Sequence, residues 1–395
     1  MKKITVGVMG LAFHSSNLGC AALSYSFMCM LDEIAEQYGL QFDVRIIFQS
    51  DDKTPLKMSF RYIDYSFVRL GLKNKAHKQQ TNAAIRECAV VFDFTMGDSF
   101  TDIYGMERFI KRTIFKQMVL RQKTPLVLGS QTYGPYRHWL SRLWAADVIR
   151  KSSEVFARDE QSLALAAKLG KRKPKLTTDV AFFLPYERQE QEAQKTHIGM
   201  NVSGLLWNGG YTRSNQFGLT VDYRTYIRTL LEQYQQDDSC VVHLIPHVVY
   251  QNELDAPDTD WHISTELAKQ YPKVRMAPFF ETPMQAKSYI AGMDVFVGAR
   301  MHATIAAYSA GVPTIPFSYS RKFEGLFDSL SYPYVVSGTR EETQAAIQKT
   351  QDYISGREQL LAAITGYQGT LDEKKKQMLG DYAGVLPDVQ AQQHE

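Results

Sequence analysis

The chain has 395 residues, of which 44% are hydrophobic, and its 45 basic and 42 acidic side chains give a net charge of +3. A chain of this length and apolar content can bury large cores and ordinarily divides into two domains. No basic block of the kind that binds nucleic acid is present, so we expect no nucleic-acid partner. The four scattered cysteines form no CxxC pair, so we expect no metal site and a location in the reducing cytoplasm.

The first 184 residues alternate strand and helix patterns. Residues 4–10 read as a strand rather than a signal peptide, because the apolar run is short and holds two glycines. Continuous apolar strand patterns and helical patterns then follow each other, with strands at 42–48, 90–97 and 125–135 and helices at 20–39, 81–89, 109–122 and 139–152. Such strands predict a parallel sheet covered on both faces, whose ligands bind beyond the carboxyl ends of the strands.

Residues 185–196 are charged and rich in glutamine without apolar periodicity, which is typical of a linker. Beyond them the alternation returns, with strand patterns at 239–249, 295–298 and 312–320. The sequence therefore predicts an α/β protein with two Rossmann-like domains facing a cleft, at 1–185 and 197–336, followed by a helical tail at 337–395 that could pack back on the first domain. No run approaches the roughly 20 apolar residues of a membrane span, although the protein could rest on a membrane surface.

The apolar stretch from Val295 to Phe317 is interrupted by Arg300 and His302, at a strand exit and helix start. Free backbone N–H groups and the helix dipole favour anions there, and a guanidinium adds a bidentate donor. Lys322, in the loop after the next strand, brings further positive charge to the same edge. We expect an anion pocket; the alternative is that Arg300 pairs with a nearby carboxylate and His302 only satisfies its helix start.

Four more loops follow predicted strands. Asn17 lies in a polar loop that could cap a helix or hold a ligand. Asp98 and Asp102 could orient a hydroxyl group or take its proton, or could simply begin a helix. Gln131 stands in a turn suited to polyol recognition, and Arg158 precedes an aspartate with which it could form a structural pair.

Other phosphate or metal motifs lack support. The sequence contains neither a GxGxxG fingerprint nor a GxxxxGK[ST] loop, so a dinucleotide or P-loop nucleotide is not indicated. His243 and His247 have metal-like spacing, but Pro246 between them excludes the helical two-histidine zinc motif. We expect no metal at this pair.

The segment GARMHATIAAYSAGVPTIPFSYSRKFEGLF closely resembles the closing signature of the polysaccharide pyruvyl transferase family. The motifs SSNLGCAAL, GDSFTD, SQTYGPY, FARDEQS, TTDVAFFL, GMNVSG and HLIPHVV also occur in the order of that family, so the resemblance spans about residues 4 to 330. It implies a glycosyltransferase B-like architecture and transfer of pyruvate from phosphoenolpyruvate to a saccharide acceptor, which could be lipid-linked. The first domain would serve the acceptor and the second the donor, without a cofactor.

The resemblance also implies roles for the residues above. His302 would be the general acid, and Asp98 or Asp102 the base or acceptor anchor. The expected substrate-binding residues are Arg300, Lys322, Arg158, Asn17, Gln131 and Met301. The resemblance is weakest before the acidic loop, where Phe94 to Gly97 replace the glycine run of many family members.

Two other functions remain open at this stage. One is a glycosyltransferase that uses a nucleotide sugar in the same cleft, with Arg300 and Lys322 holding a diphosphate. The other is a non-catalytic module of a polysaccharide assembly complex, in which these charges only hold the fold together. Homo-oligomerisation and contact with the inner face of the membrane are further expectations for the partners.

Overall fold

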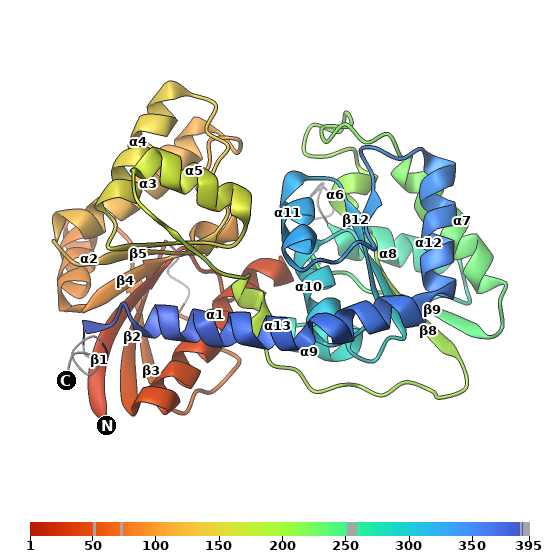
Figure 1. The fold of residues 1–395 in the computed structure, drawn as a ribbon, viewed down its shortest axis with the longest axis horizontal. Coiled ribbons are helices and arrows are strands. Elements are labelled where there is room, and N and C mark those ends of the chain that lie inside the picture. Colours follow the sequence, from red (N-terminus) through yellow and green to blue (C-terminus); the bar gives the residue numbers. More distant parts are fainter. Residues whose placement is uncertain (50–52, 72–73, 251–258, 388, 390–395) are drawn as a thin grey trace. The chain divides into compact units, whose positions relative to one another are not determined.

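The computed structural model describes residues 1–49, 53–71, 74–250, 259–387 and 389. The chain forms two compact units (Figure 1). Unit 1 comprises Met1–Phe13, Leu23–Phe183 and Asp372–Glu395, and unit 2 comprises His14–Ala22 and Leu184–Leu371. The main division thus lies between Phe183 and Leu184.

Unit 1 is built on a seven-stranded, fully parallel sheet with the strand order β3-β2-β1-β4-β5-β6-β7. Every residue of β4 and β5 is buried, as the continuous apolar patterns predict for strands covered on both faces. The strands are β1 (Lys2–Met9), β2 (Leu40–Phe48), β3 (Ile63–Arg69), β4 (Val90–Asp93), β5 (Leu126–Gln131), β6 (Glu154–Ala157) and β7 (Lys175–Leu176). The helices are α1 (Leu18–Tyr38), α2 (Lys75–Glu87), α3 (Met106–Arg121), α4 (Trp139–Lys151) and α5 (Glu160–Gly170), with 3₁₀ turns η1 (Thr95–Gly97) and η2 (Val180–Phe183).

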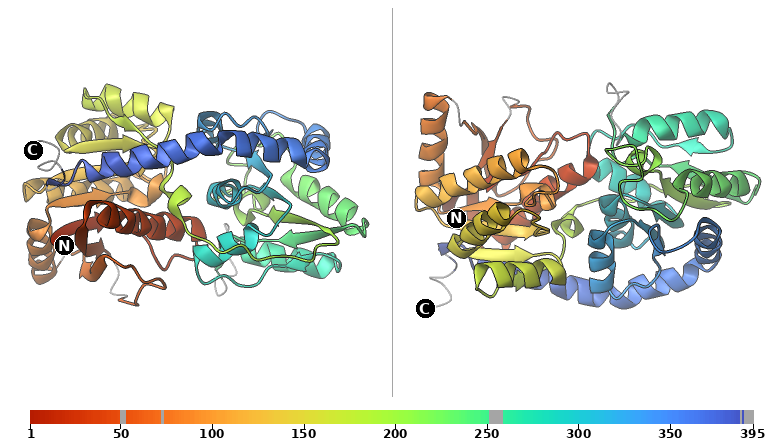
Figure 2. Two further views of the ribbon diagram at one scale, coloured as in Figure 1. Left: turned by 60° about the horizontal axis from the view of Figure 1, so that its bottom comes forward. Right: turned by 90° about the horizontal axis from the view of Figure 1, so that it is seen from above.

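Unit 2 repeats this plan with a six-stranded parallel sheet in the order β10-β9-β8-β11-β12-β13. Helices lie on both faces of each sheet (Figure 2). The strands are β8 (Thr196–Asn201), β9 (Cys240–Leu244), β10 (Arg275–Met276), β11 (Val295–Gly298), β12 (Thr314–Ser318) and β13 (Val336–Ser337). The helices are α6 (Gly204–Trp207), α7 (Tyr223–Gln235), α8 (Asp260–Gln270), α9 (Pro283–Ile290), α10 (Met301–Ser309), α11 (Arg321–Ser329), α12 (Thr343–Ser355) and α13 (Arg357–Ala383).

Both sheets have a topological switch point. In unit 1 the chain first adds strands on one side of β1, through β2 and β3, and then returns to add β4 on the other side. In unit 2 it does the same around β8, so β8 and β11 are the neighbours at which the strand order reverses. Ligands of open α/β sheets bind beyond the carboxyl ends of the strands at such points. The fold therefore marks the loops after β1 and β4 and those after β8 and β11.

The segment His14–Ala22 belongs to unit 2 although the strand before it belongs to unit 1. Asn17 forms an antiparallel bridge with Val248, the backbone N–H of Leu18 donates to the His247 carbonyl at 2.9 Å, and that of Val249 donates to the Ser16 carbonyl at 2.8 Å. The sequence-based boundary at residue 185 does not anticipate this exchange. The second half of the loop after β1 and the first residues of α1 are therefore a structural part of unit 2.

Helix α1 is long and apolar enough to cross a membrane, but 78% of its apolar window is buried inside the protein. Its apolar character is thus that of a core helix. At the other end of the chain, α12 lies in unit 2, whereas α13 continues from unit 2 into unit 1 at Asp372. Tyr382 near its end stacks on Phe156 with 4.2 Å between ring centroids, and its hydroxyl accepts from the Ser130 N–H at 2.8 Å.

Candidate functional site

The carboxyl ends of β8 and β11 are joined by the side chain of Asn201, the last residue of β8. Its Oδ1 accepts from the backbone N–H of Arg300 at 2.9 Å, and its Nδ2 donates to the Ile245 carbonyl just after β9 at 3.0 Å. Arg300 is in turn the N-cap residue of α10, which follows β11. One amide therefore fixes the exits of three adjacent strands at the switch point of unit 2.

Arg300 is held by a fully buried carboxylate at the start of α8. Its Nη2 and Nε lie 2.7 and 3.1 Å from Asp260 Oδ1, and only 11% of the Arg300 side chain is exposed. Asp260 also accepts from Asn201 Nδ2 and from the backbone N–H groups of Gly204, His247 and Val248, at 2.9 to 3.2 Å. The carboxylate pairing that the sequence left open for Arg300 is present, and it fixes the direction of the guanidinium. A substrate contact by Arg300 stays a prediction.

His302 lies in the first turn of α10 against the segment His14–Ala22. A Cβ atom at Gly19 would come within 2.5 Å of His302 Nδ1, so only glycine allows the imidazole to lie this close to the start of α1. Asn17 begins that helix, and its Oδ1 accepts from the backbone N–H of Gly19 at 3.1 Å. The structure thus brings Asn17 and His302 to one end of unit 2, with the Asn17 side chain serving as a helix cap.

Sequence reasoning missed His247, which it considered only as a metal ligand. The residue is 3% exposed, and neither of its ring nitrogens has a hydrogen-bond partner among the described residues. Burial, together with the charges of His302 and Arg300, lowers the pKa of His247 to about 3. A buried polar ring without partners is expensive unless a ligand or water meets it. The signal that could have found it is its position directly after β9, at the same edge as Arg300.

The last two predicted residues of unit 2 are less informative. Met301 is 5% exposed at the first position of α10, between Arg300 and His302. Lys322 lies in the first turn of α11, but its side chain is outside the part of the chain that the structure describes. Substrate contacts by Met301 and Lys322 stay predictions.

Unit 1 has a buried ionic network at its own switch point. Lys116 on α3 is fully buried, and its Nζ lies 2.9 Å from Asp93 Oδ1 at the end of β4 and 2.6 Å from Thr95 Oγ1. The Thr95 hydroxyl donates to the same Asp93 oxygen. Burial lowers the pKa of Lys116, and the nearby Asp93 charge opposes this effect. The network therefore ties the loop after β4 to the core.

This network holds a strained loop. Thr95, Met96 and Gly97 have φ values of 44°, 56° and 81°, in the left-handed region that glycine adopts readily and a β-branched residue adopts at a cost. The backbone N–H of Met96 donates to the Gly10 carbonyl at 2.8 Å, which joins the exits of β1 and β4. Thr95 and Met96 thus keep a glycine-like backbone at the place where the family resemblance is weakest.

Removing one member of the buried pair should destabilise unit 1 strongly. Lys116→Met leaves the Asp93 carboxylate buried without its partner, so we expect a loss of about 3–5 kcal/mol in the free energy of unfolding. Urea unfolding of the full chain measures it. Lys111→Met is the matched control, because Lys111 pairs with Glu107 on the exposed face of the same helix and should change stability by about 0.5 kcal/mol or less. Equal losses in the two variants would contradict the structural role of the buried pair.

Arg158 and Gln131 lie at the ends of neighbouring strands of unit 1 and are both buried. Arg158 Nη1 donates to Asp179 Oδ2 at 2.9 Å and its Nε to Thr132 Oγ1 at 2.9 Å, while Gln131 Nε2 donates to the Asp93 carbonyl at 3.1 Å. Among the described residues, Arg158 Nη2 and Gln131 Oε1 are buried without a hydrogen-bond partner. One donor and one acceptor thus remain for a ligand or water at this edge.

The two candidate carboxylates have different surroundings. Asp98 is half-buried after η1 and accepts from the Tyr104 hydroxyl at 3.1 Å. Asp102 is 6% exposed and accepts from the backbone N–H groups of Arg137 and His138 and from Ser141 Oγ, at 2.5 to 2.9 Å. Burial alone would raise the pKa of Asp102, but these hydrogen bonds outweigh it and lower the pKa below its ordinary value. Asp102 therefore anchors the residues that lead into α4, whereas Asp98 is the more exposed of the two carboxylates.

The sequence profile of the family described as polysaccharide pyruvyl transferase matches residues 17–321, which is most of the chain. The chain belongs to this family. The match runs from Asn17, just before α1, to the start of α11, so it omits β1 but contains the loops after β4, β8 and β11. No curated protein has a significantly similar sequence.

Solved structures confirm that this family member has the glycosyltransferase B-like architecture expected from the sequence. HepE from Anabaena, in complex with UDP-glucose, is 11% identical and has a TM-score of 0.57, with 98% of this chain and 100% of that chain covered. UDP-GlcNAc 2-epimerase from Neisseria meningitidis bound to UDP-GlcNAc is 12% identical, with a TM-score of 0.57 and coverage of 96% and 99%. Sucrose-phosphate synthase from Thermosynechococcus elongatus is 12% identical, with a TM-score of 0.58 and coverage of 96% and 98%. At these identities the likeness shows the fold alone.

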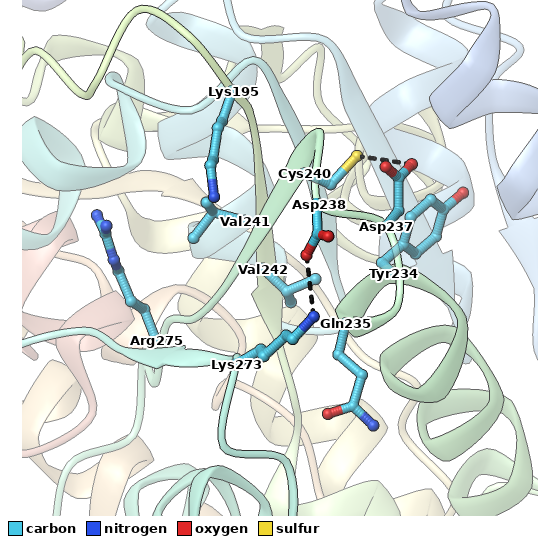
Figure 3. Close-up of a pocket in the computed structure, with 10 residues that line it drawn as sticks. All are labelled: Lys195, Tyr234, Gln235, Asp237, Asp238, Cys240, Val241, Val242, Lys273 and Arg275. Atoms are coloured by element: carbon cyan, nitrogen blue, oxygen red, sulfur yellow. Dashed lines mark hydrogen bonds and ion pairs between the residues drawn. The ribbon is translucent and has the colours of Figure 1, made fainter.

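A shallow pocket of about 270 Å³ lies elsewhere on this family member, near the first residues of β8, β9 and β10 (Figure 3). Among its lining residues, Lys273 Nζ lies 2.9 Å from Asp238 Oδ1, and Cys240 Sγ lies 3.4 Å from Asp237 Oδ2. This is the amino-terminal edge of the sheet, opposite to the edge at which parallel sheets bind ligands. Within the described residues, no group of three histidine, cysteine, aspartate or glutamate side chains is arranged to hold a metal ion.

Proposed function

We propose that the protein transfers pyruvate from phosphoenolpyruvate to a hydroxyl, or a hydroxyl pair, of a surface polysaccharide or its precursor. The observation that carries this proposal is the Arg300–Met301–His302 start of α10 at the switch point of unit 2, in a chain that belongs to the polysaccharide pyruvyl transferase family. Phosphoenolpyruvate carries a phosphate and a carboxylate. Helix starts and guanidinium groups bind both kinds of anion.

Donor binding would use groups that are already oriented. Asp260 holds the Arg300 guanidinium in one direction, so an anion beyond the α10 start would meet a preorganised donor. The unpartnered ring nitrogens of buried His247 would be satisfied by the same ligand or by its water. Met301 and Lys322 complete the donor side of the proposal. No resident cofactor is part of it.

The proposed chemistry needs one acid and one base. His302 donates a proton to the methylene carbon of phosphoenolpyruvate while an acceptor hydroxyl attacks the central carbon, which gives a phosphorylated ketal. A neighbouring hydroxyl then displaces phosphate and closes the cyclic ketal, and its proton leaves with the phosphate. In unit 1, Asp98 is the proposed base, or the group that anchors the acceptor. Asp102 supports the start of α4.

The remaining residues of unit 1 are proposed as substrate contacts. Arg158 Nη2 would donate to an anion or hydroxyl, and Gln131 Oε1 would accept from a sugar hydroxyl, because both atoms are buried without a partner among the described residues. The Asn17 side chain caps α1, so we assign it to positioning of the loop that contacts His302. Because phosphoenolpyruvate is an intracellular metabolite, the proposal includes action in the cytoplasm, on a free or lipid-linked acceptor.

The test is acceptor-dependent release of phosphate from phosphoenolpyruvate, measured with a panel of saccharides. His302→Gln should reduce the rate by roughly 10²–10⁴-fold, the usual contribution of a general acid. Donor affinity, measured by calorimetry, should change little. His138→Gln is the control, because His138 is exposed and lies in unit 1. Arg300→Ala is a poorer probe, since it leaves Asp260 buried without its cation.

The other outcomes distinguish the alternative functions. Binding of a nucleotide sugar without competition by phosphoenolpyruvate would replace the proposal with glycosyl transfer. Full complementation of polysaccharide synthesis by His302→Gln would identify a non-catalytic module. Phosphate release that needs no acceptor would also contradict a transferase.

A further inference from the structure

The first half of α4 presents an apolar face to solvent. Eleven large apolar side chains are exposed among the described residues. Four of the eleven lie in one six-residue stretch of this helix, residues 139–144. Trp139 is 68% exposed, Leu143 57%, and Leu140 and Trp144 41% each. Exposed apolar side chains scattered singly are ordinary, but a cluster with two tryptophans indicates an interaction surface. We call these four residues the α4 face.

The rest of the helix holds this face in place. Ser141, Ala145, Val148 and Ile149 are buried and pack α4 onto unit 1. Asp102 caps the helix start through the backbone of Arg137 and His138, and Ser141 Oγ donates to the same carboxylate at 2.5 Å. The α4 face is thus the exposed side of a firmly anchored helix. Figure 1 shows the place of α4 in unit 1.

The charge around the α4 face is positive. From Arg137 to Lys151 the chain has four basic residues and one acidic residue. Arg137 and Arg142 are exposed beside the apolar side chains. The acidic residue, Asp147, is already bound by Lys151 at 2.8 Å and by Gln117 at 2.8 Å. Among the described residues, no carboxylate forms an ion pair with Arg137 or Arg142, so the surface offers two arginines next to tryptophan and leucine.

We propose that the α4 face binds the surface of an anionic lipid membrane. Tryptophan prefers the boundary between headgroups and acyl chains, because its ring is apolar and its N–H is polar. Leucine adds buried apolar area, and each arginine near an anionic surface strengthens the attraction. A second copy of this chain would face the same arginines, so like charges disfavour it as the occupant. This inference does not depend on the proposed reaction, although it suits an acceptor carried on a lipid.

The test is sedimentation of the full-length protein with vesicles of phosphatidylcholine mixed with phosphatidylglycerol. We expect binding that falls as salt is raised and that is weak on phosphatidylcholine alone. The double variant Trp139→Ser/Trp144→Ser should lower the partition coefficient by about tenfold or more, and Arg142→Glu should weaken binding only to the anionic vesicles. Since all three side chains are exposed, thermal unfolding should stay unchanged.

Leu361→Ser is the matched control, because Leu361 is 43% exposed and lies on α13 in unit 2. It should bind vesicles as the unaltered protein does. Failure of the unaltered protein to bind anionic vesicles would overturn the proposal, as would equal binding by the tryptophan variant. An oligomer that the tryptophan variant dissociates, without any vesicle binding, would assign the α4 face to a second copy instead and equally overturn it.

Discussion

Replacing Asp260 by alanine should lower the free energy of unfolding by about 3–5 kcal/mol, the usual cost of removing one partner of a buried ion pair. Arg300 would keep its charge at 11% exposure but would lose the Asp260 carboxylate. Asn201 Nδ2 and three backbone N–H groups would also lose their acceptor, which adds to the loss. Urea unfolding of the full chain measures the change.

A second aspartate of unit 2 provides the comparison. Asp222 caps α7 by accepting from the backbone N–H groups of Arg224 and Thr225, but it is exposed. Asp222→Ala should therefore cost only about 0.5–2 kcal/mol, as for an ordinary helix cap. If Asp260→Ala costs no more than Asp222→Ala, the network around Asp260 is not a structural centre of unit 2.

The same variant also tests the proposed donor site. In Asp260→Ala protein that is still folded, Arg300 can turn away from its present direction, so phosphoenolpyruvate should bind more weakly than to the Asp222→Ala variant. The expected loss is about tenfold or more, which corresponds to about 1.4 kcal/mol. Unchanged donor affinity would show that the orientation of Arg300 by Asp260 is not needed for binding.

The fold could be predicted from local patterns because its central strands, such as β4, β5 and β11, are short apolar runs with both faces covered. The edge strands β3, β7 and β10 are partly exposed and lack this pattern. β11 and α10 illustrate the prediction from local patterns, since the sequence places a strand at Val295 to Gly298 and a helix start at Arg300 and His302. Parallel topology then brings the strand exits to one edge, which is why Arg300 and His302 could be singled out. Local pattern and global fold agree in this region.

The partners of these residues could not be predicted, because they are distant in the sequence. Asp260 is 40 residues from Arg300, and no pattern links the start of α8 to the start of α10. Gly19 lies in the first turn of α1, far from His302 in the sequence, yet it is the residue that allows His302 its position in unit 2. Likewise, no pattern in the sequence links Asp102 to its contacts with His138 and Ser141 at the start of α4. Contacts of this kind are set by tertiary packing rather than by local propensity.

Acidification should destabilise the protein between about pH 6.5 and pH 3. Burial, with the nearby charges of His197 and Arg275, lowers the pKa of His243 to about 3, and burial with His302 and Arg300 does the same for His247. Both pKa values lie below the ordinary value of about 6.5 that these side chains regain on unfolding, so in this range the unfolded chain binds two protons that the folded chain does not. Their contribution to stability is therefore complete above pH 6.5 and is lost as the pH falls toward 3.

The expected slope approaches about 1.4 kcal/mol per pH unit for each histidine, which gives about 3 kcal/mol for both between pH 6.5 and pH 5. Urea unfolding at a series of pH values measures it. His247→Leu should remove about half of the slope, because His247 is one of the two contributing histidines. Leucine is a suitable replacement, since the His247 ring has no hydrogen-bond partner among the described residues that would be left unsatisfied. His138→Gln, at an exposed position, should leave the slope unchanged. A slope that persists in full in His247→Leu would mean that this imidazole is charged in the folded protein, with its proton shared by a ligand or water at the proposed donor site.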